Sequence, residues 1–134
     1  NTTTHAGSIS EALRRMAFLF PPEEQAARSF DLMTSLNLII WQRLVKTADR
    51  EGRVALREYL VFDQNVRDRF LSVPPLEWVN VVKQIFSDSC SNPNLIARTM
   101  TQSAEQLVQR KVVRAEDVSG LLQTGIGFLG QIKL

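Results

Sequence analysis

Residues 51–70 constrain the fold of this chain more than any other stretch. Arg53 to Phe62 are rich in valine, leucine, tyrosine and phenylalanine, which favour a strand. A polar turn that contains a glycine precedes them at residues 49–52. Asp63 follows them, at the place where a helix N-cap belongs. We therefore predict a strand over 53–62 that leads directly into a helix over 64–71.

The sequence before this turn predicts a second strand and two helices. Gln42 to Thr47 is the strand candidate, so the two strands would form an antiparallel hairpin. Ser8 and Glu11 match the capping-box pattern and begin a helix with apolar residues at helical spacing. Two consecutive prolines end that helix and begin the next, with acidic residues in its first turn. This second helix is expected to continue to about Ile40.

Beyond Asp63 the sequence predicts helices only. They are expected over residues 75–89, 95–111 and 114–123, with the longest at 95–111. Proline and asparagine residues break the pattern between them. Residues 125–134 contain three glycines and no clear period, so we expect a tail that docks elsewhere or frays.

The composition excludes several classes of protein. A length of 134 residues suits one domain, or a domain fragment with a small subdomain. The net charge is only +2 and no dense block of lysine and arginine occurs, so no direct nucleic-acid partner is expected. The single Cys90 excludes an internal disulfide, and with one histidine it excludes a cysteine–histidine zinc site. No apolar run approaches the length of about 18 residues that suggests a membrane span.

The residues for a complete catalytic site are missing from the sequence. A phosphate-binding loop needs several glycines followed by Lys and Ser or Thr. Lys46-Thr47 is the only Lys followed by Ser or Thr, and the five residues before it contain no glycine. No Ser/His/Asp pattern and no local cluster of histidine and carboxylates appears either. We therefore expect no catalysis from this chain alone.

His5 is the exception. A lone histidine in a polar loop is ordinarily a surface residue. Here it is followed by Ala-Gly-Ser, a helix containing Arg15, and Phe20-Pro21. This order resembles the His box of the PilT/DotB-type secretion and pilus ATPases. The resemblance implies that His5 points toward the terminal phosphate of a nucleotide and reports its state through a charge-assisted hydrogen bond.

Further blocks resemble the same family in the same order. Phe-Pro at 20–21 is followed by two glutamates, and Gly-Arg-Val-Ala at 52–55 is followed by Glu58. Residues 100–113 resemble a late helix of the family, although Arg110-Lys111 occupy a place where glycine is usual. Residues 55–63 resemble the DotB and conjugation branch. Residues 65–72 depart from the helix that pilus-retraction motors carry, which argues against a retraction role.

The resemblance implies an α/β fold, the C-terminal portion of a RecA-like P-loop ATPase domain followed by an all-α subdomain. Residues 1–63 would be the remnant of the ATPase core, and residues 64–134 the helical subdomain. The chain, which begins at Asn1 without a methionine, then reads as a piece of a larger protein. The fragment alone would bind neither ATP nor Mg²⁺ and would be inactive.

The intact protein implied by the resemblance is a cytoplasmic homohexamer, peripheral at the inner membrane. It would use ATP and Mg²⁺ and dock on inner-membrane secretion-system proteins. It would power type IV (Dot/Icm-like) secretion or plasmid transfer. Two other interpretations remain open: a non-enzymatic α-rich protein-interaction module, and a helix-turn-helix DNA binder over residues 94–123, which the mixed charge disfavours.

Overall fold

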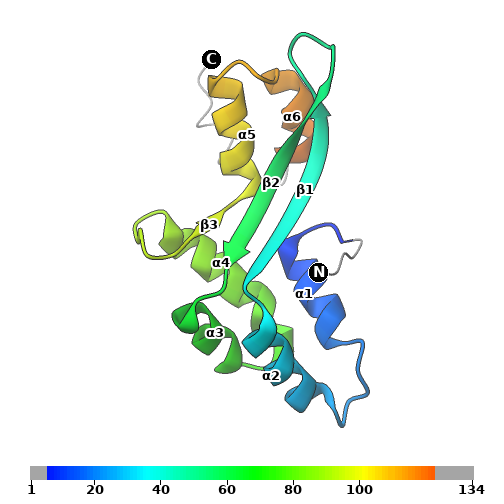
Figure 1. Ribbon diagram of the computed structural model, residues 1–134, viewed down its shortest axis with the longest axis vertical. Coiled ribbons are helices and arrows are strands. Elements are labelled where there is room, and N and C mark those ends of the chain that lie inside the picture. Colours follow the sequence, from blue (N-terminus) through cyan, green and yellow to red (C-terminus); the bar gives the residue numbers. More distant parts are fainter. Residues whose placement is uncertain (1–5, 123–134) are drawn as a thin grey trace. The chain divides into compact units, whose positions relative to one another are not determined.

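A computed structural model describes residues 6–122 of the chain (Figure 1). Two helices are followed by a hairpin, and further helices with one short strand follow the hairpin. The sheet has three strands in the order β1-β2-β3. The predicted α/β class is therefore confirmed. The elements are α1 (Ile9–Ala17), α2 (Gln25–Ser35), β1 (Leu38–Lys46), β2 (Arg53–Val61), α3 (Gln64–Leu71), the 3-10 turn η1 (Pro75–Glu77), α4 (Trp78–Ser89), β3 (Ala97–Arg98), α5 (Met100–Gln109) and α6 (Ala115–Leu122).

The chain divides into two compact units. Among the described residues, the first comprises those up to Trp41 together with Tyr59–Ala97. The second comprises Gln42–Glu58 and the residues from Arg98 onward. The predicted boundary at residues 63–64 is of a different kind. It separates a remnant of the ATPase core, residues 1–63, from a helical subdomain, residues 64–134. The division by contacts does not test that boundary, which stays a prediction.

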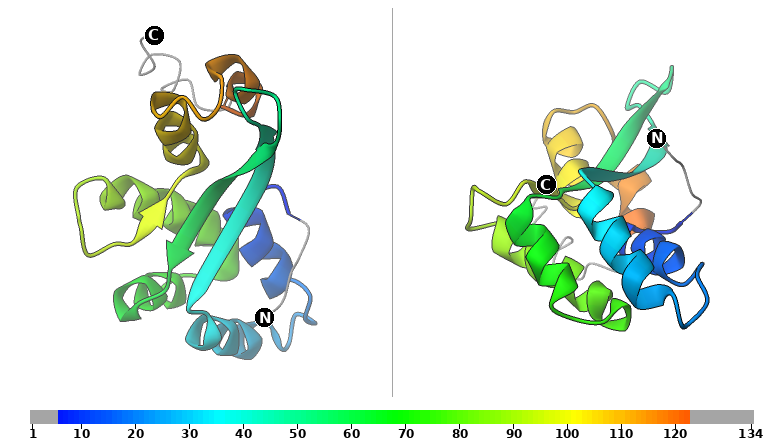
Figure 2. Two further views of the ribbon diagram at one scale, coloured as in Figure 1. Left: turned by 45° about the horizontal axis from the view of Figure 1, so that its top comes forward. Right: turned by 60° about the horizontal axis from the view of Figure 1, so that its bottom comes forward.

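Aromatic residues form the centre of the first unit. Phe70 and Trp78 are 0% and 2% exposed, and the Phe70 ring stacks on Phe62 with centroids 5.6 Å apart. The Trp78 ring meets Phe70 edge to face, and its Nε1 donates to the Phe70 carbonyl at 3.0 Å. Each such side chain buries about 150–250 Å², so they dominate the packing energy. Helices α1 and α4 pack together around them, as do α2 and α3 (Figure 2). Trp78 is thus a core anchor.

The helix α3 begins and ends as the sequence predicts, and its charged residues are engaged locally. The Asp63 side chain accepts from the Val66 N–H at 2.8 Å, which is the expected N-cap. Arg69 Nη1 lies 2.7 Å from Asp88 on α4, and this bond holds the pKa of Asp88 below its ordinary value. Val66 and Phe70 form the buried side of the helix.

Arg67 on α3 closes the C-terminal end of α2. Its Nε donates to the Met33 carbonyl at 3.2 Å, and its Nη2 donates to the Leu36 carbonyl and to Asn37 Oδ1, both at 3.0 Å. The last carbonyls of a helix have no partner within the helix. A guanidinium can serve several of them at once because its donors form a rigid, planar fork.

The second predicted helix is too long, and the first predicted strand is too short. α2 ends at Ser35 and β1 already begins at Leu38, so Ile40 lies in a strand. The run Leu-Ile-Ile-Trp suits a strand as well as a helix, and pairing with β2 decides between them. The Thr47 N–H donates to the Gly52 carbonyl at one end, and the Phe62 N–H donates to the Asn37 carbonyl at the other. Both strands advance by the same number of residues between these bonds, so the pairing has no bulge.

Buried and exposed side chains alternate along the two strands of the hairpin in agreement with this register. Val45 on β1 and Leu56 and Leu60 on β2 share one face and are at most 8% exposed. Leu38, Ile40 and Leu44 lie on the other face of β1. They are 49%, 51% and 57% exposed. Successive side chains of a strand point to opposite faces.

The prediction of helices only after Asp63 is wrong. Residues 97–98 form β3, and the Val61 N–H on β2 donates to the Ile96 carbonyl at 3.0 Å. α5 starts at Met100 because Thr99 and Gln102 form a capping box, each side chain bonding the other's N–H at 3.1 and 2.9 Å. With 12 residues, α4 is the longest described helix. None of the described helices has the length and apolar character to cross a membrane.

A left-handed residue ends α5 in the second unit. Lys111 has φ 60°. Its N–H donates to the Val108 carbonyl at 3.0 Å, and the Val112 N–H donates to the Leu107 carbonyl at 2.9 Å. These two bonds define a Schellman motif, in which glycine ordinarily fills the left-handed position. The lysine therefore stands where the fold itself favours a glycine.

Replacing Arg67 should destabilise the chain strongly. Arg67→Ala leaves carbonyls at the end of α2 without donors, so we expect the free energy of unfolding to fall by about 2 kcal/mol. Arg67→Lys should cost roughly half as much. A lysine ammonium still donates hydrogen bonds, but it cannot reproduce the planar fork of the guanidinium. Urea denaturation checks both. Arg43→Ala, which removes an exposed arginine of β1, is the control. Equal stability of Arg67→Ala and Arg43→Ala would contradict the assignment.

Replacing Lys111 with glycine should stabilise the chain. Lys111→Gly removes the cost of holding a residue with a side chain in the left-handed backbone conformation. The free energy of unfolding should therefore rise by about 0.5–1 kcal/mol. Arg110→Gly is the matched control, because Arg110 has φ −79° and gains nothing from glycine. Thermal unfolding of the two variants should shift the midpoint in opposite directions. A lower midpoint for Lys111→Gly would contradict the prediction, because the relief of the left-handed conformation would then be smaller than the cost of losing the lysine side chain.

Candidate functional site

The predicted site residue, His5, lies outside the described residues. The structure begins to describe this segment at residue 6, immediately after the histidine. The candidate site is therefore built from the residues that follow His5 and from α1.

A close network of polar contacts surrounds the start of α1. Ser8 is the N-cap, and its Oγ accepts from the Glu11 N–H at 3.1 Å. Glu11 Oε2 accepts from the Gly7 N–H at 2.6 Å, and Glu11 Oε1 lies 2.5 Å from Arg15 Nη2. The predicted Ser8 cap is confirmed. The Glu11 carboxylate, however, bonds the N–H one residue before the cap.

Gly7 fits this network because it has no side chain. A Cβ built at Gly7 would lie 2.8 Å from Glu11 Oε2, closer than real Cβ contacts allow. The glycine of the Ala-Gly-Ser block therefore permits the carboxylate to approach the backbone. In the sequence, the glycine stands directly before the N-cap and the glutamate stands three residues after it. Only the structure shows that the two residues are in contact.

The buried side of α1 holds the helix in place. Ile9 and Leu13 are 0% exposed, and Ala17 is 1% exposed. Arg14 and Arg15 lie on the exposed side of the helix. The first turn of α1 is thus anchored by Ile9, and Glu11 in this turn bonds the loop before the helix and Arg15 in its last turn.

The Phe-Pro block is fixed by the start of α2. Gln25 Nε2 donates to the Phe20 carbonyl at 3.1 Å, and the Arg28 guanidinium lies 5.8 Å from the centre of the Phe20 ring. Because α2 begins at Gln25, Glu23 and Glu24 lie just before its first turn rather than in it. The block therefore acts as a structured connection between the two helices.

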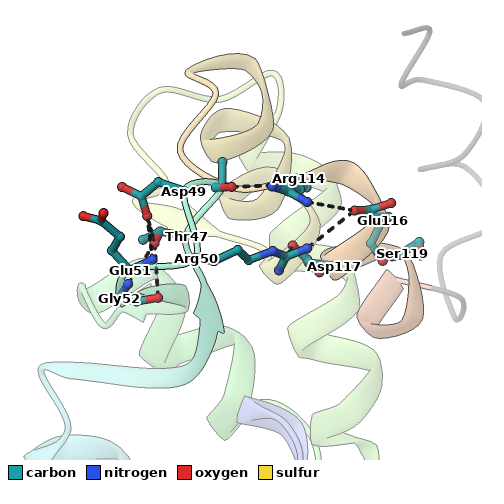
Figure 3. Close-up of polar contacts among 10 residues, drawn as sticks. Thr47, Asp49, Arg50, Glu51, Gly52, Arg114, Glu116, Asp117 and Ser119 are labelled. Carbon is teal, nitrogen blue, oxygen red and sulfur yellow. Dashed lines mark hydrogen bonds and ion pairs between the residues drawn. The ribbon is translucent and has the colours of Figure 1, made fainter.

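The Gly-Arg-Val-Ala block begins β2 and closes the turn of the hairpin (Figure 3). Thr47 Oγ1 donates to Asp49 Oδ1 at 2.5 Å, and the Glu51 N–H donates to the same oxygen at 2.9 Å. The Thr47 hydroxyl, and after it the Glu51 N–H, hold the pKa of Asp49 below its ordinary value. The Gly52 N–H donates to Thr47 Oγ1 at 3.2 Å. These contacts use the hydroxyl of the only Lys-Thr pair for the turn itself.

Arg50 connects this turn to the start of α6 (Figure 3). It has φ 67°, and its Nη1 lies 2.8 Å from Asp117 Oδ2. Its Nη2 lies 3.5 Å from Glu116 Oε1. Arg114 Nε donates to the Ala48 carbonyl at 3.0 Å. Glu116 and Asp117 occupy the first turn of α6 and both pair with Arg50 of the hairpin turn. Glu116 Oε1 also lies 3.7 Å from Arg114 Nη1.

The described residues hold neither a phosphate loop nor a metal site. Lys46 ends β1 and Thr47 opens a tight turn, so this pair does not sit at the N-terminus of a helix. Among residues 6–122, no group of histidine, cysteine, aspartate and glutamate could hold a metal ion.

Known proteins match the chain over most of its length. It is 30% identical over 114 residues to a twitching motility protein of Neisseria gonorrhoeae, which covers 85% of the chain. The X-ray structure of the Legionella pneumophila ATPase DotB covers 90% of the chain with 30% identity and a TM-score of 0.78. The pilus retraction motor PilT, solved with bound ADP, shares the fold, with 23% identity over 87% of the chain and a TM-score of 0.68. No family model matches the chain.

The chain belongs to the PilT/DotB-like ATPases. Sequence and structure agree on this over nearly the whole chain, as the resemblance of the motifs implied. This chain spans only 29% of the length of the twitching motility protein and 31% of that of DotB.

Asp117 should matter more to stability than its neighbour Glu116. The two share the first turn of α6, but Asp117 lies 2.8 Å from Arg50 and is 22% exposed, whereas Glu116 lies at 3.5 Å and is 70% exposed. We expect Asp117→Asn to lower the free energy of unfolding by about 0.5–1 kcal/mol and Glu116→Gln by less than half of that. Urea denaturation at low and high salt measures both. Equal losses would show that only the helix dipole matters.

Proposed function

We propose that this chain is part of an ATPase that powers secretion. The intact protein would be a cytoplasmic homohexamer, peripheral at the inner membrane, that hydrolyses ATP with Mg²⁺. It would act on inner-membrane secretion-system proteins in type IV (Dot/Icm-like) secretion or plasmid transfer. The observation that carries this proposal is the match to DotB, at 30% identity and a TM-score of 0.78 over 90% of the chain.

In this proposal the nucleotide is held mainly by residues beyond this chain. The described residues lack a glycine-rich phosphate loop, and the Thr47 hydroxyl is engaged by Asp49 and Gly52. The chain alone would then bind no ATP or Mg²⁺ and would show no turnover. ATP and Mg²⁺ would supply the phosphoryl group and the charge neutralisation that its transfer needs.

His5 would be the contribution of this chain to the nucleotide site. An imidazole that donates a hydrogen bond to a terminal phosphate loses that partner on hydrolysis. The loss can change the packing of one domain on another, and such rigid-body motion is a common way for ATPases to do work. The anchored first turn of α1, which follows His5 in the chain, supports this role because a sensor needs a fixed base.

A role on the DotB side of the family is favoured over pilus retraction. The TM-score to DotB is 0.78 and that to PilT is 0.68. The residues of α3 that depart from the retraction pattern have local roles or face solvent: Arg69 pairs with Asp88, and Leu71 is 36% exposed. These observations support secretion or conjugative transfer as the process that the intact protein drives.

The proposal predicts activity for the full-length protein and none for the chain. The reading frame that encodes the chain should contain a phosphate loop before Asn1. The full-length protein should hydrolyse ATP only with Mg²⁺, and the purified 134-residue chain should not. His5→Gln should lower kcat of the full-length protein roughly a hundredfold if it contacts the reacting phosphate. A frame without a phosphate loop would instead favour the non-enzymatic α-rich interaction module.

A further inference from the structure

One face of the hairpin in the second unit carries basic and apolar side chains and no acidic one. The Thr47 N–H donates to the Gly52 carbonyl, so the next residues along the strands, Lys46 and Arg53, stand directly opposite each other. Successive side chains of a strand point to opposite faces. We call the side of the two strands that carries this pair the open face. It consists of Gln42, Leu44, Lys46, Arg53, Ala55 and Arg57.

The three cations of the open face have no counter-charge in the described part of the chain. Lys46, Arg53 and Arg57 are all exposed, and none of them takes part in an ion pair within residues 6–122. The acidic residues that open α6 do not serve them, because both pair with Arg50 of the hairpin turn (Figure 3). The positive charge of the open face is therefore available to another molecule or domain.

The placement of these cations costs stability as long as the face meets only water. Lys46 and Arg53 form a pair that exchanges no backbone hydrogen bonds, in which the Cα atoms are about 4.5 Å apart and the side chains are closest. Like charges directly opposite each other destabilise a sheet. Arg57 adds a positive charge about 13 Å from Arg53 along the strand. A negatively charged surface that lies against the open face would turn this repulsion into attraction.

An apolar contact surface lies between the two basic ends of the open face. Leu44 is 57% exposed, whereas Val45 and Leu56 on the opposite face of the strands are at most 8% exposed. Arginine is enriched, and apolar area is central, where two polypeptide surfaces meet. Free phosphate is bound instead by successive backbone N–H groups, which a paired strand does not offer. The open face therefore has the chemistry of a docking surface for an acidic polypeptide.

We propose that the open face binds an acidic surface of the intact polypeptide that lies outside this chain, an inference that rests on the proposed function. The chain spans 31% of DotB and 29% of the twitching motility protein, so most of the length of such proteins lies outside the matched region. In the intact protein, carboxylates of that part lie against the three cations, and an apolar side chain covers Leu44. The contact attaches the hairpin to the remainder of the ATPase.

The test compares the effect of one charge in two proteins. In the 134-residue chain, Arg53→Gln relieves the repulsion with Lys46, so hydrogen exchange of hairpin peptides over residues 42–58 should slow by about two- to fivefold. In the full-length protein, the same change leaves a covered carboxylate without its partner, so exchange of these peptides should become faster by at least that factor. Mass spectrometry measures both. Slower or unchanged exchange in full-length Arg53→Gln would overturn the proposal.

Two further variants test the charge and the face. Arg53→Lys keeps the positive charge and should alter the exchange in the full-length protein less than Arg53→Gln does. Equal acceleration by the two variants would contradict an acidic partner. Arg43→Gln is the matched control, because Arg43 is an exposed arginine on the opposite face of β1 and also has no ion pair within residues 6–122. Acceleration as large as that of Arg53→Gln would contradict a specific role for the open face.

Other occupants of the open face are distinguished by the state of the chain itself. Sedimentation of the 134-residue chain over a wide range of concentrations should show no association that Arg53→Gln abolishes. Such an association would identify a second copy as the occupant and overturn the proposal, as would a reading frame that encodes no further domain. Absence of ATP turnover in the wild-type full-length protein would refute the proposed function, whereas the exchange measurements would still decide whether the open face is covered.

Discussion

The register of the β-hairpin is the constraint on which both units of the chain depend. It is set at one end by the turn between Thr47 and Gly52 and at the other by the bond between Asn37 and Phe62. A slip by one residue would turn Val45 out of its buried position and bring Leu44 into it. Each unit uses its own part of the hairpin. Leu60 and Phe62 belong to the aromatic core of the first, and Val45 and Leu56 are buried in the second.

Residues in the stretches that match the family, and in those that depart from it, have clear structural tasks. Gly52 closes the hairpin turn, and Arg67 satisfies the last carbonyls of α2. Lys111 takes the left-handed position that ends α5. Such tasks depend on backbone geometry more than on neighbouring side chains. The chain shares its fold with DotB at 30% identity and with PilT at 23% identity.

Local signals in the sequence predicted the elements that are set locally. Asp63 and Ser8 cap helices because their side chains reach backbone groups three residues away, and α3 has the predicted bounds. β1 and β3 were missed or shortened because pairing across the sheet decides them. Leu38 to Ile40 continue an apolar pattern that a helix also accepts. The two residues of β3 are a strand only because β2 lies beside them.

The candidate site also has features that the sequence predicts and features that only the structure shows. The cap at Ser8 follows from the spacing of residues. The close approach of Glu11 to Gly7 could not be read from the sequence, since it depends on the path of the backbone before the cap. Only the order of the family's motifs distinguishes His5 from an ordinary surface histidine. The residues that follow it in the sequence form an ordinary helix cap, and they include no other histidine or cysteine.

The order of strands in the sheet has a consequence for how the chain reaches its native state. β1 and β2 are joined by a short turn, so the entropy lost in closing that loop is small. β3 joins β2 only after α3, η1 and α4 have been passed along the chain. Closing this longer loop costs more entropy, and contacts of high sequence separation slow folding. Of the two pairings in the sheet, that of β3 with β2 therefore carries the larger loop-closure cost, and its formation is coupled to the folding of the helices between them.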